Sequence, residues 1–138
     1  MTDTAGTPPE QTPEQTPEQI VDAFIGALER LDLEAGLALL AEDVEYDNVP
    51  MAKVQGLEGV RSVLQPFLGR ASEVEWKILH QAASGDTVMN ERVDRFHMPN
   101  GWIEIAVAGL FVVRDGKIVL WRDYFDLGAA TAALRSGG

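Results

Sequence analysis

The sequence contains no cysteine among its 138 residues. Disulfide bonds, thiolate metal sites and cysteine nucleophiles are therefore all excluded. Histidine is nearly as scarce, because only His80 and His97 are present and their spacing matches no metal-binding pattern. We therefore expect no metal ion in this protein.

The sequence also has few positively charged residues and no long apolar run. The chain has 11 Lys and Arg against 22 Asp and Glu, a net charge of −11, which argues against nucleic acid or an anionic membrane as a partner. The longest apolar run, residues 105–113, is far shorter than the roughly 20 residues that span a bilayer. The first residues, 1–4, have neither the basic start nor the apolar run of a signal peptide. We expect a soluble, cytoplasmic protein.

What is present is typical of a single globular domain with a tail. Hydrophobic residues make up 46% and charged residues 24% of the chain, whose length suits one domain with its own core. The unit Thr-Pro-Glu-Gln occurs at 12–15 and again at 16–19. Such a polar tract cannot bury enough surface to order itself, so we expect residues 1–15 to form a disordered tail before a domain at 16–138.

Three helices are predicted in the first half of the domain. Thr16 as N-cap and Gln19 three residues later form a capping box that starts a helix over 17–31. Apolar residues at helical spacing predict further helices over 33–40 and 56–69.

Strands dominate the second half. A short extended piece is expected at 44–49, and the period switches to two over 73–80 and 87–98. Residues 102–113 are almost wholly apolar, which predicts a central strand covered on both faces, and a last strand follows over 118–126. Helices followed by a meander of strands predict an α+β fold, with the helices packed in a strongly curved, mixed or antiparallel, cone-shaped sheet.

Asp123 has an unusual setting, because it lies between Trp121 and Phe125 on one face of the last strand. A carboxylate there either pairs with a cation or has a raised pKa. Arg92 and Asp94 lie two residues apart on the strand 87–98, so they point the same way, with Cα atoms roughly 6.6 Å apart. If that face is the cavity face, both project beside Asp123 from a nearby strand of the meander. An arginine between two carboxylates leaves the cluster at net −1, so one acid can hold a proton while the other is ionised.

Simpler interpretations remain open at this point. Four charged residues of the second long strand are equally compatible with a solvated ladder on the sheet surface: Glu91, Arg92, Asp94 and Arg95. Tyr46 and Asn48 share a face that fits either a half-buried strand end or a pair of groups holding a water molecule. His80 lies on the apolar side of its strand, which predicts a hydrogen-bonded core histidine rather than a catalytic one.

Three motifs occur in this order along the chain: Tyr46-x-Asn48, Glu91-Arg92-Val93-Asp94 and the run from Trp121 to Asp126. Together, and at these separations, they resemble the limonene-1,2-epoxide hydrolase family, in a similarity that covers about residues 17–127. The resemblance implies the curved α+β cone fold shared with ketosteroid isomerases and SnoaL-type polyketide cyclases. It also implies a homodimer that needs neither metal nor cofactor.

The resemblance also implies a role for each polar residue. Asp123 would be the general base that deprotonates water, held in place by Tyr46 and Asn48. Asp94 would be the acid that protonates the epoxide oxygen, and Arg92 would bridge the two aspartates. The implied reaction adds water to a small, largely apolar epoxide in one step, giving a vicinal diol without a covalent intermediate.

The apolar surroundings of this site are less well specified. We expect Phe96, Trp121 and Phe125 to line the substrate pocket. The segment 49–56 should help to shape the mouth of the pocket, and its sequence leaves the choice of substrate open. Two other functions fit the same fold: an isomerase or cyclase acting on a carbonyl compound, and a ligand-binding module without catalytic activity.

Overall fold

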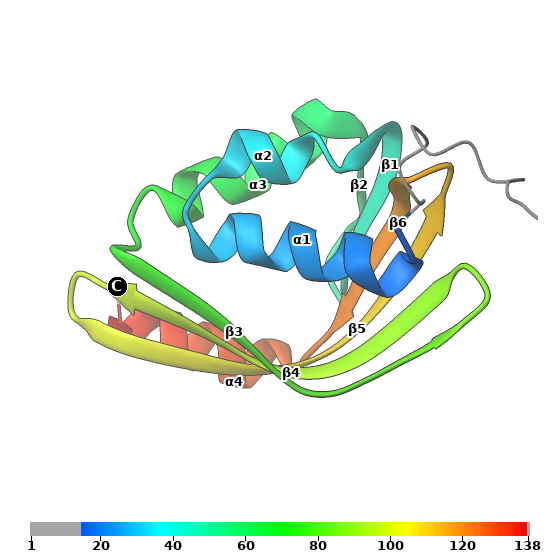
Figure 1. Ribbon diagram of the computed structural model, residues 1–138. Helices are drawn as coiled ribbons and strands as arrows, with labels where there is room; N and C mark the ends of the chain where they lie inside the picture. Colours follow the sequence, from blue (N-terminus) through cyan, green and yellow to red (C-terminus); the bar gives the residue numbers. More distant parts are fainter. Residues whose placement is uncertain (1–14, 138) are drawn as a thin grey trace, which may run out of the picture.

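The computed structural model describes residues 15–137, which form four helices packed against one six-stranded sheet (Figure 1). The elements in chain order are α1 (Pro17–Glu29), α2 (Leu33–Leu37), β1 (Leu40–Val49), β2 (Val54–Gln55), α3 (Gly56–Leu68), β3 (Glu73–Ser84), β4 (Thr87–Met98), β5 (Gly101–Arg114), β6 (Lys117–Tyr124) and α4 (Leu127–Gly137). The predicted α+β class is confirmed. Residues 1–14 of the predicted tail lie outside the described part.

The sheet is mixed rather than purely antiparallel. Its strand order is β2-β1-β6-β5-β4-β3, and β3 to β6 form the predicted meander. β1 joins this meander in parallel beside β6, with Asn48 opposite Asp123. The sheet bends strongly around α1, which lies across its concave face (Figure 1). This topology brings the polar residues of β1, β4 and β6 to one concave surface.

The core lies between α1 and the concave face. α1 begins with the predicted capping box, in which Thr16 and Gln19 satisfy each other's backbone N–H groups. Its apolar face buries Phe24, whose ring meets Trp121 edge-on at a centroid distance of 4.9 Å. The Phe111 ring of β5 is nearly parallel to the Trp121 ring, at a centroid distance of 6.3 Å, and also meets Phe24 edge-on. These rings form an apolar base beneath the polar cluster described below.

Two of the predicted helices end earlier than the apolar periodicity suggested. α1 stops at Glu29, and Leu31 adopts a left-handed backbone with φ of 59°. α2 stops at Leu37, and Leu40 is buried as the first residue of β1 instead. A leucine at helical spacing fits a helix face and an inward strand position equally well. No helix in the described range is long and apolar enough to cross a membrane.

The prediction for His80 was wrong. Its side chain is 84% exposed and its Nδ1 lies 2.8 Å from the carboxylate of Glu91 on the outer face of the sheet. The pairing of β3 with β4 shifts between Ile78 and His80, so one extra residue enters β3. Such a bulge moves every later side chain to the opposite face, which strict alternation cannot anticipate.

The expectation that β5 is covered on both faces was also wrong. Its inward residues from Ile103 to Val113 are buried except Ile105, which is partly buried, but Ala106 and Ala108 on the outer face are exposed. Met89 of β4 and Tyr124 of β6, exposed by 56% and 46%, lie on the neighbouring strands. An unbroken apolar run therefore marks an outer face that no part of the described chain covers.

Candidate active site

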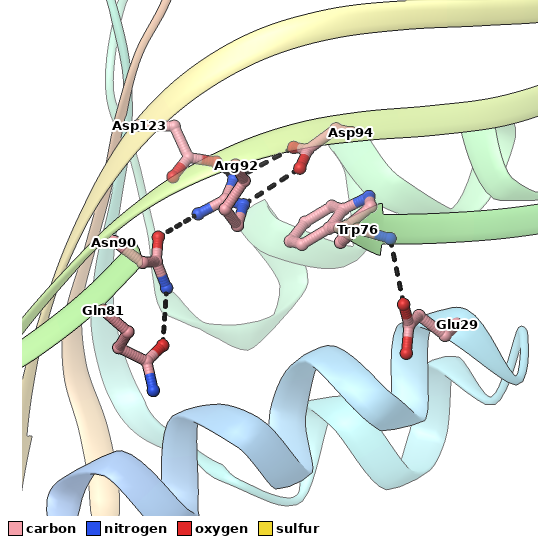
Figure 2. A network of polar contacts seen from close by, with 7 residues as sticks. All are labelled: Glu29, Trp76, Gln81, Asn90, Arg92, Asp94 and Asp123. Carbon is pink, nitrogen blue, oxygen red and sulfur yellow. Dashed lines mark hydrogen bonds and ion pairs between the residues drawn. The ribbon is translucent and has the colours of Figure 1, made fainter. Parts of the chain in front are cut away.

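Arg92 joins the two aspartates at the centre of the concave face. Its Nε and Nη2 donate to Asp94 Oδ1 and Oδ2 at 2.9 and 3.0 Å, and Nη2 also donates to Asp123 Oδ2 at 3.1 Å (Figure 2). The three residues are only 1%, 4% and 5% exposed, respectively. The predicted charge cluster is therefore a buried, arginine-bridged pair of acids, and the solvated-ladder interpretation is excluded for these residues.

Two further groups hold the guanidinium that the sequence reasoning did not include. Asn90, two residues before Arg92 on the same face of β4, accepts from Nη1 through its Oδ1 at 2.9 Å. The Trp76 ring lies beneath the guanidinium, with its centroid 4.7 Å from Cζ. Asn90 lies two residues before Arg92 and therefore shares the buried face with Arg92 and Asp94. This spacing would have predicted Asn90 as a neighbour of the cluster, once that face was known to be buried.

Burial controls the protonation of the pair. It raises the pKa of Asp94 to about 6, although hydrogen bonds and charge from Arg92 act in the opposite direction. Burial raises the pKa of Asp123 as well, offset in part by Arg92 and by the nearby Trp121 indole. Burial alone would lower the pKa of Arg92, but the two carboxylates raise it above its usual value. Burial therefore favours the protonated form of both carboxyl groups, and their proximity to one another couples their protonation.

Tyr46 and Asn48 reach the same place from β1. In the parallel pairing with β6, Tyr46 lies beside Trp121 and Asn48 beside Asp123. The Tyr46 ring stacks on the Trp121 ring at a centroid distance of 3.9 Å. Burial and the charge of Asp123 raise the pKa of the Tyr46 hydroxyl, while Asn48 lowers it in part, so the hydroxyl stays protonated. Both side chains are hydrogen-bonding groups next to Asp123.

Asp123 differs from Asp94 in having a free oxygen. Both oxygens of Asp94 accept from Arg92, whereas only Oδ2 of Asp123 does. Oδ1 of Asp123 is buried and has no hydrogen-bond partner among the described residues. A buried carboxylate oxygen without a donor is costly when charged, in line with the raised pKa of Asp123.

The cluster opens into a cavity of about 310 Å³. Its walls come from α3, α4 and the concave face of the sheet, and they are largely apolar. The polar side chains among its lining residues are Tyr46, Asn48, Asp94, Asp123 and Thr131. An apolar hollow with a few converging polar groups is the usual form of a small-molecule site.

Two of the three aromatic residues that were expected to line this cavity do line it, Phe96 and Phe125. Trp121 does not, because it is fully buried behind Tyr46, between that ring and Phe24. The prediction that Trp121 and Asp123 share one face of β6 is correct, but Tyr46 of the neighbouring strand β1 covers the Trp121 ring. α4 contributes lining residues that the sequence reasoning did not include: Leu127, Ala130, Thr131 and Leu134.

Gly109 of β5 provides the space for the cluster. It lies between Asn90 on β4 and Asp123 on β6 in the sheet register. A Cβ atom at this position would lie 2.3 Å from Nη1 of Arg92 and 3.0 Å from Oδ1 of Asp123. Any side chain here would displace the guanidinium or the carboxylate, so the backbone requires glycine at this point of close approach.

No group of three His, Asp or Glu side chains within residues 15–137 is arranged so that it could hold a metal ion. Arg92 occupies the position between the two buried acids that a cation would take. The site therefore has the donor set of an acid–base centre.

Comparisons with known proteins identify relatives of this chain by sequence and by fold. The family model described as the limonene-1,2-epoxide hydrolase catalytic domain matches residues 15–134. Epoxide hydrolase EphG of Mycobacterium tuberculosis is 39% identical over 127 residues, which cover 92% of this chain and 85% of that protein. The structure of an LEH-like epoxide hydrolase from M. tuberculosis superposes with a TM-score of 0.76 at 34% identity, covering 88% and 90% of the two chains.

The same fold occurs in proteins with other names. A putative polyketide cyclase from Xanthomonas campestris superposes with a TM-score of 0.74 at 26% identity, covering 86% of this chain and 96% of that one. The fold alone thus leaves the reaction open, whereas the family model and the sequence identity to EphG do not depend on the fold alone. The chain belongs to the limonene-1,2-epoxide hydrolase family.

Proposed function

We propose that this protein hydrolyses a small, largely apolar epoxide to a vicinal diol in one step, without a covalent intermediate. The observation that carries the proposal is the buried Asp94–Arg92–Asp123 cluster at the wall of an apolar cavity. Epoxide opening needs a proton at the departing oxygen and a base for the attacking water. An arginine-bridged pair of acids that shares one proton supplies both.

Asp123 is the general base in this proposal. Its carboxyl group lines the cavity, and Tyr46 and Asn48 line the same cavity from the adjacent strand β1. A water molecule held by these two side chains donates one proton to Asp123 while its oxygen attacks an epoxide carbon. The hydrogen bond from that water favours the ionised form of Asp123.

Asp94 is the general acid. It lines the same cavity, and burial keeps its carboxyl protonated in weakly acidic solution. As the C–O bond of the epoxide breaks, Asp94 gives its proton to the departing oxygen. After turnover Asp123 holds a proton and Asp94 is ionised, a state that the two N–H bonds from Arg92 to Asp94 favour. A proton must then return to Asp94 before the next cycle.

The cavity and the chemistry limit the substrate and the cofactor. A volume of about 310 Å³ is at the small end of the range of about 300–1,000 Å³ for ligand pockets, and the mostly apolar walls favour a hydrocarbon body. Proton transfer and C–O bond exchange change no oxidation state, so the reaction draws on no redox cofactor. An isomerase of this fold would need one base and an oxyanion donor, neither of which requires an arginine that bridges two carboxylates.

We also propose that the protein is a homodimer, as its family resemblance implies. The exposed apolar outer face around Ala108, Met89 and Tyr124 is a suitable contact surface for a second copy. The mass measured by light scattering in solution tests this, and a monomer at micromolar concentration would contradict it.

The function itself is tested by a single turnover in ¹⁸O-labelled water. Excess protein is mixed with each member of a panel of small cyclic and linear epoxides, and the product is analysed by mass spectrometry. We expect a vicinal diol that carries the label from the first turnover. Labelled water that enters the diol only in later turnovers would indicate an enzyme ester, and no diol from any epoxide would contradict the function.

A further inference from the structure

The third nitrogen of the Arg92 guanidinium is held by a residue outside the cavity. Nη1 donates to Oδ1 of Asn90 at 2.9 Å (Figure 2), and Asn90 is not among the residues that line the cavity. Asn90 therefore contacts the arginine but does not line the cavity. Its amide is the only contact that Nη1 makes among the hydrogen bonds of the described residues.

The orientation of this amide is determined by a chain of hydrogen bonds to α1. Nδ2 of Asn90 donates to Oε1 of Gln81 at 3.0 Å, and Nε2 of Gln81 donates to the carboxylates of Asp22 at 3.1 Å and Glu18 at 3.4 Å. In each of these hydrogen bonds the donor lies on the side of the guanidinium and the acceptor on the side of the α1 carboxylates. If either amide rotated by half a turn, N–H would face N–H and oxygen would face oxygen. The carboxylates of α1 thus ensure that Asn90 presents its oxygen to Arg92.

The backbone of β5 independently indicates that this contact is part of the site. Gly109 lies opposite Asn90 in the sheet, and a Cβ there would lie 2.8 Å from Oδ1 of Asn90 and 2.3 Å from Nη1 of Arg92. The space that glycine leaves is filled by these two atoms. The Trp76 ring beneath the guanidinium restricts its tilt but supplies no hydrogen-bond acceptor.

We propose that Asn90, oriented by Gln81 and the carboxylates of α1, is a positioning residue for Arg92. It fixes the rotation of the guanidinium plane, so that Nε and Nη2 reach Asp94 and Asp123 at the same time. The kinetic part of this inference rests on the proposed epoxide hydrolysis, whereas the positioning of Arg92 does not depend on it.

The test uses Asn90→Leu, Gln81→Met and the double variant, with Glu91→Gln as a matched control on the outer face of the same strand. Loss of a hydrogen bond to a charged group should lower kcat of Asn90→Leu about 10- to 100-fold. KM should stay unchanged, because Asn90 does not contact the cavity. Gln81→Met should show a smaller fall, and Glu91→Gln should behave as the unchanged protein.

The double variant tests whether Gln81 acts through Asn90 or independently of it. If Gln81 acts only through Asn90, the double variant should be no slower than Asn90→Leu alone. Multiplied effects in the double variant, or a raised KM with unchanged kcat in Asn90→Leu, would overturn the proposal. Should Asn90→Leu fail to fold, Gln81→Met, a change nearer the surface, still provides the comparison.

A second measurement needs no substrate. The ¹⁵N NMR signals of the Arg92 guanidinium should be resolved in the unchanged protein, because rotation about its C–N bonds is blocked by the four hydrogen bonds. In Asn90→Leu they should broaden or merge, and in Gln81→Met they should broaden less. Identical signals in Asn90→Leu would overturn the positioning role. If the unchanged protein opened no epoxide, the proposed function would fail while this measurement still tested the inference.

Discussion

Asp123→Asn is expected to reduce diol formation by about 10³-fold or more, since a general base typically contributes about 10²–10⁴ in rate and the substitution also removes the acceptor for the water proton. An amide is nearly the same size as the carboxylate, so the neighbouring side chains keep their positions. Arg92 retains its two bonds to Asp94, so no charge is left unpaired. The measurement is kcat for an epoxide that the unchanged protein hydrolyses, together with the urea midpoint of unfolding.

Asp115→Asn is the matched control, because it makes the same chemical change in the exposed turn between β5 and β6. It should retain full activity. Asp94→Asn should be nearly as inactive as Asp123→Asn, because an amide cannot donate an acidic proton to the departing oxygen. Activity near that of the unchanged protein in either site variant would remove that aspartate from the mechanism.

Arg92→Met should have the largest effect on stability. It leaves Asp94 and Asp123 buried without a cation, and breaking a buried ion pair by removing one partner costs about 3–5 kcal/mol. The free energy of unfolding from urea titrations at pH 7.5 measures this loss. Arg122→Met is the control: that arginine pairs with Asp47 and Glu45 where all three are partly exposed, so its loss should cost about 1 kcal/mol or less.

The loss in Arg92→Met should also depend on pH. Without the guanidinium the folded-state pKa of both aspartates rises further, whereas in the unfolded chain it is about 3.9. Between these values the folded protein binds more protons than the unfolded chain, so its stability falls as pH rises through that window. Unfolding at pH 4.5 should therefore show a smaller deficit than at pH 7.5. An equal deficit at both values would mean that lost packing, not unpaired charge, is the cause.

Much of the site was accessible from the sequence because strands alternate strictly where they are regular. Arg92 and Asp94 share a face because they are two residues apart in β4, whose bounds were predicted correctly. Hydropathy could not tell which face of β4 is buried, since the inward face carries an arginine, an aspartate and an asparagine. Their burial is compensated by partners on other strands, which no single segment reveals.

What the sequence did not predict has a small number of physical causes. The bulge in β3 moves His80 outward, and nothing in the local residue types marks it. Trp121 has the correct alternation for the cavity but is covered by Tyr46, because β1 pairs with β6 in parallel. The role of Asn90 depends on Gln81 and Asp22, which are brought together only by the packing of α1 on the edge strand β3.

The central claim is that two buried acids share one arginine and keep one proton between them. The most direct measurement is a ¹³C NMR titration of the side-chain carboxyls of the unliganded protein, with Asp123→Asn used to assign the signals. We predict a step of the Asp94–Asp123 pair at about pH 6, well above the usual aspartate pKa of about 3.9. If both carboxyls titrated at about pH 4 or below, neither could deliver a proton to an epoxide near neutral pH, and the account would be contradicted.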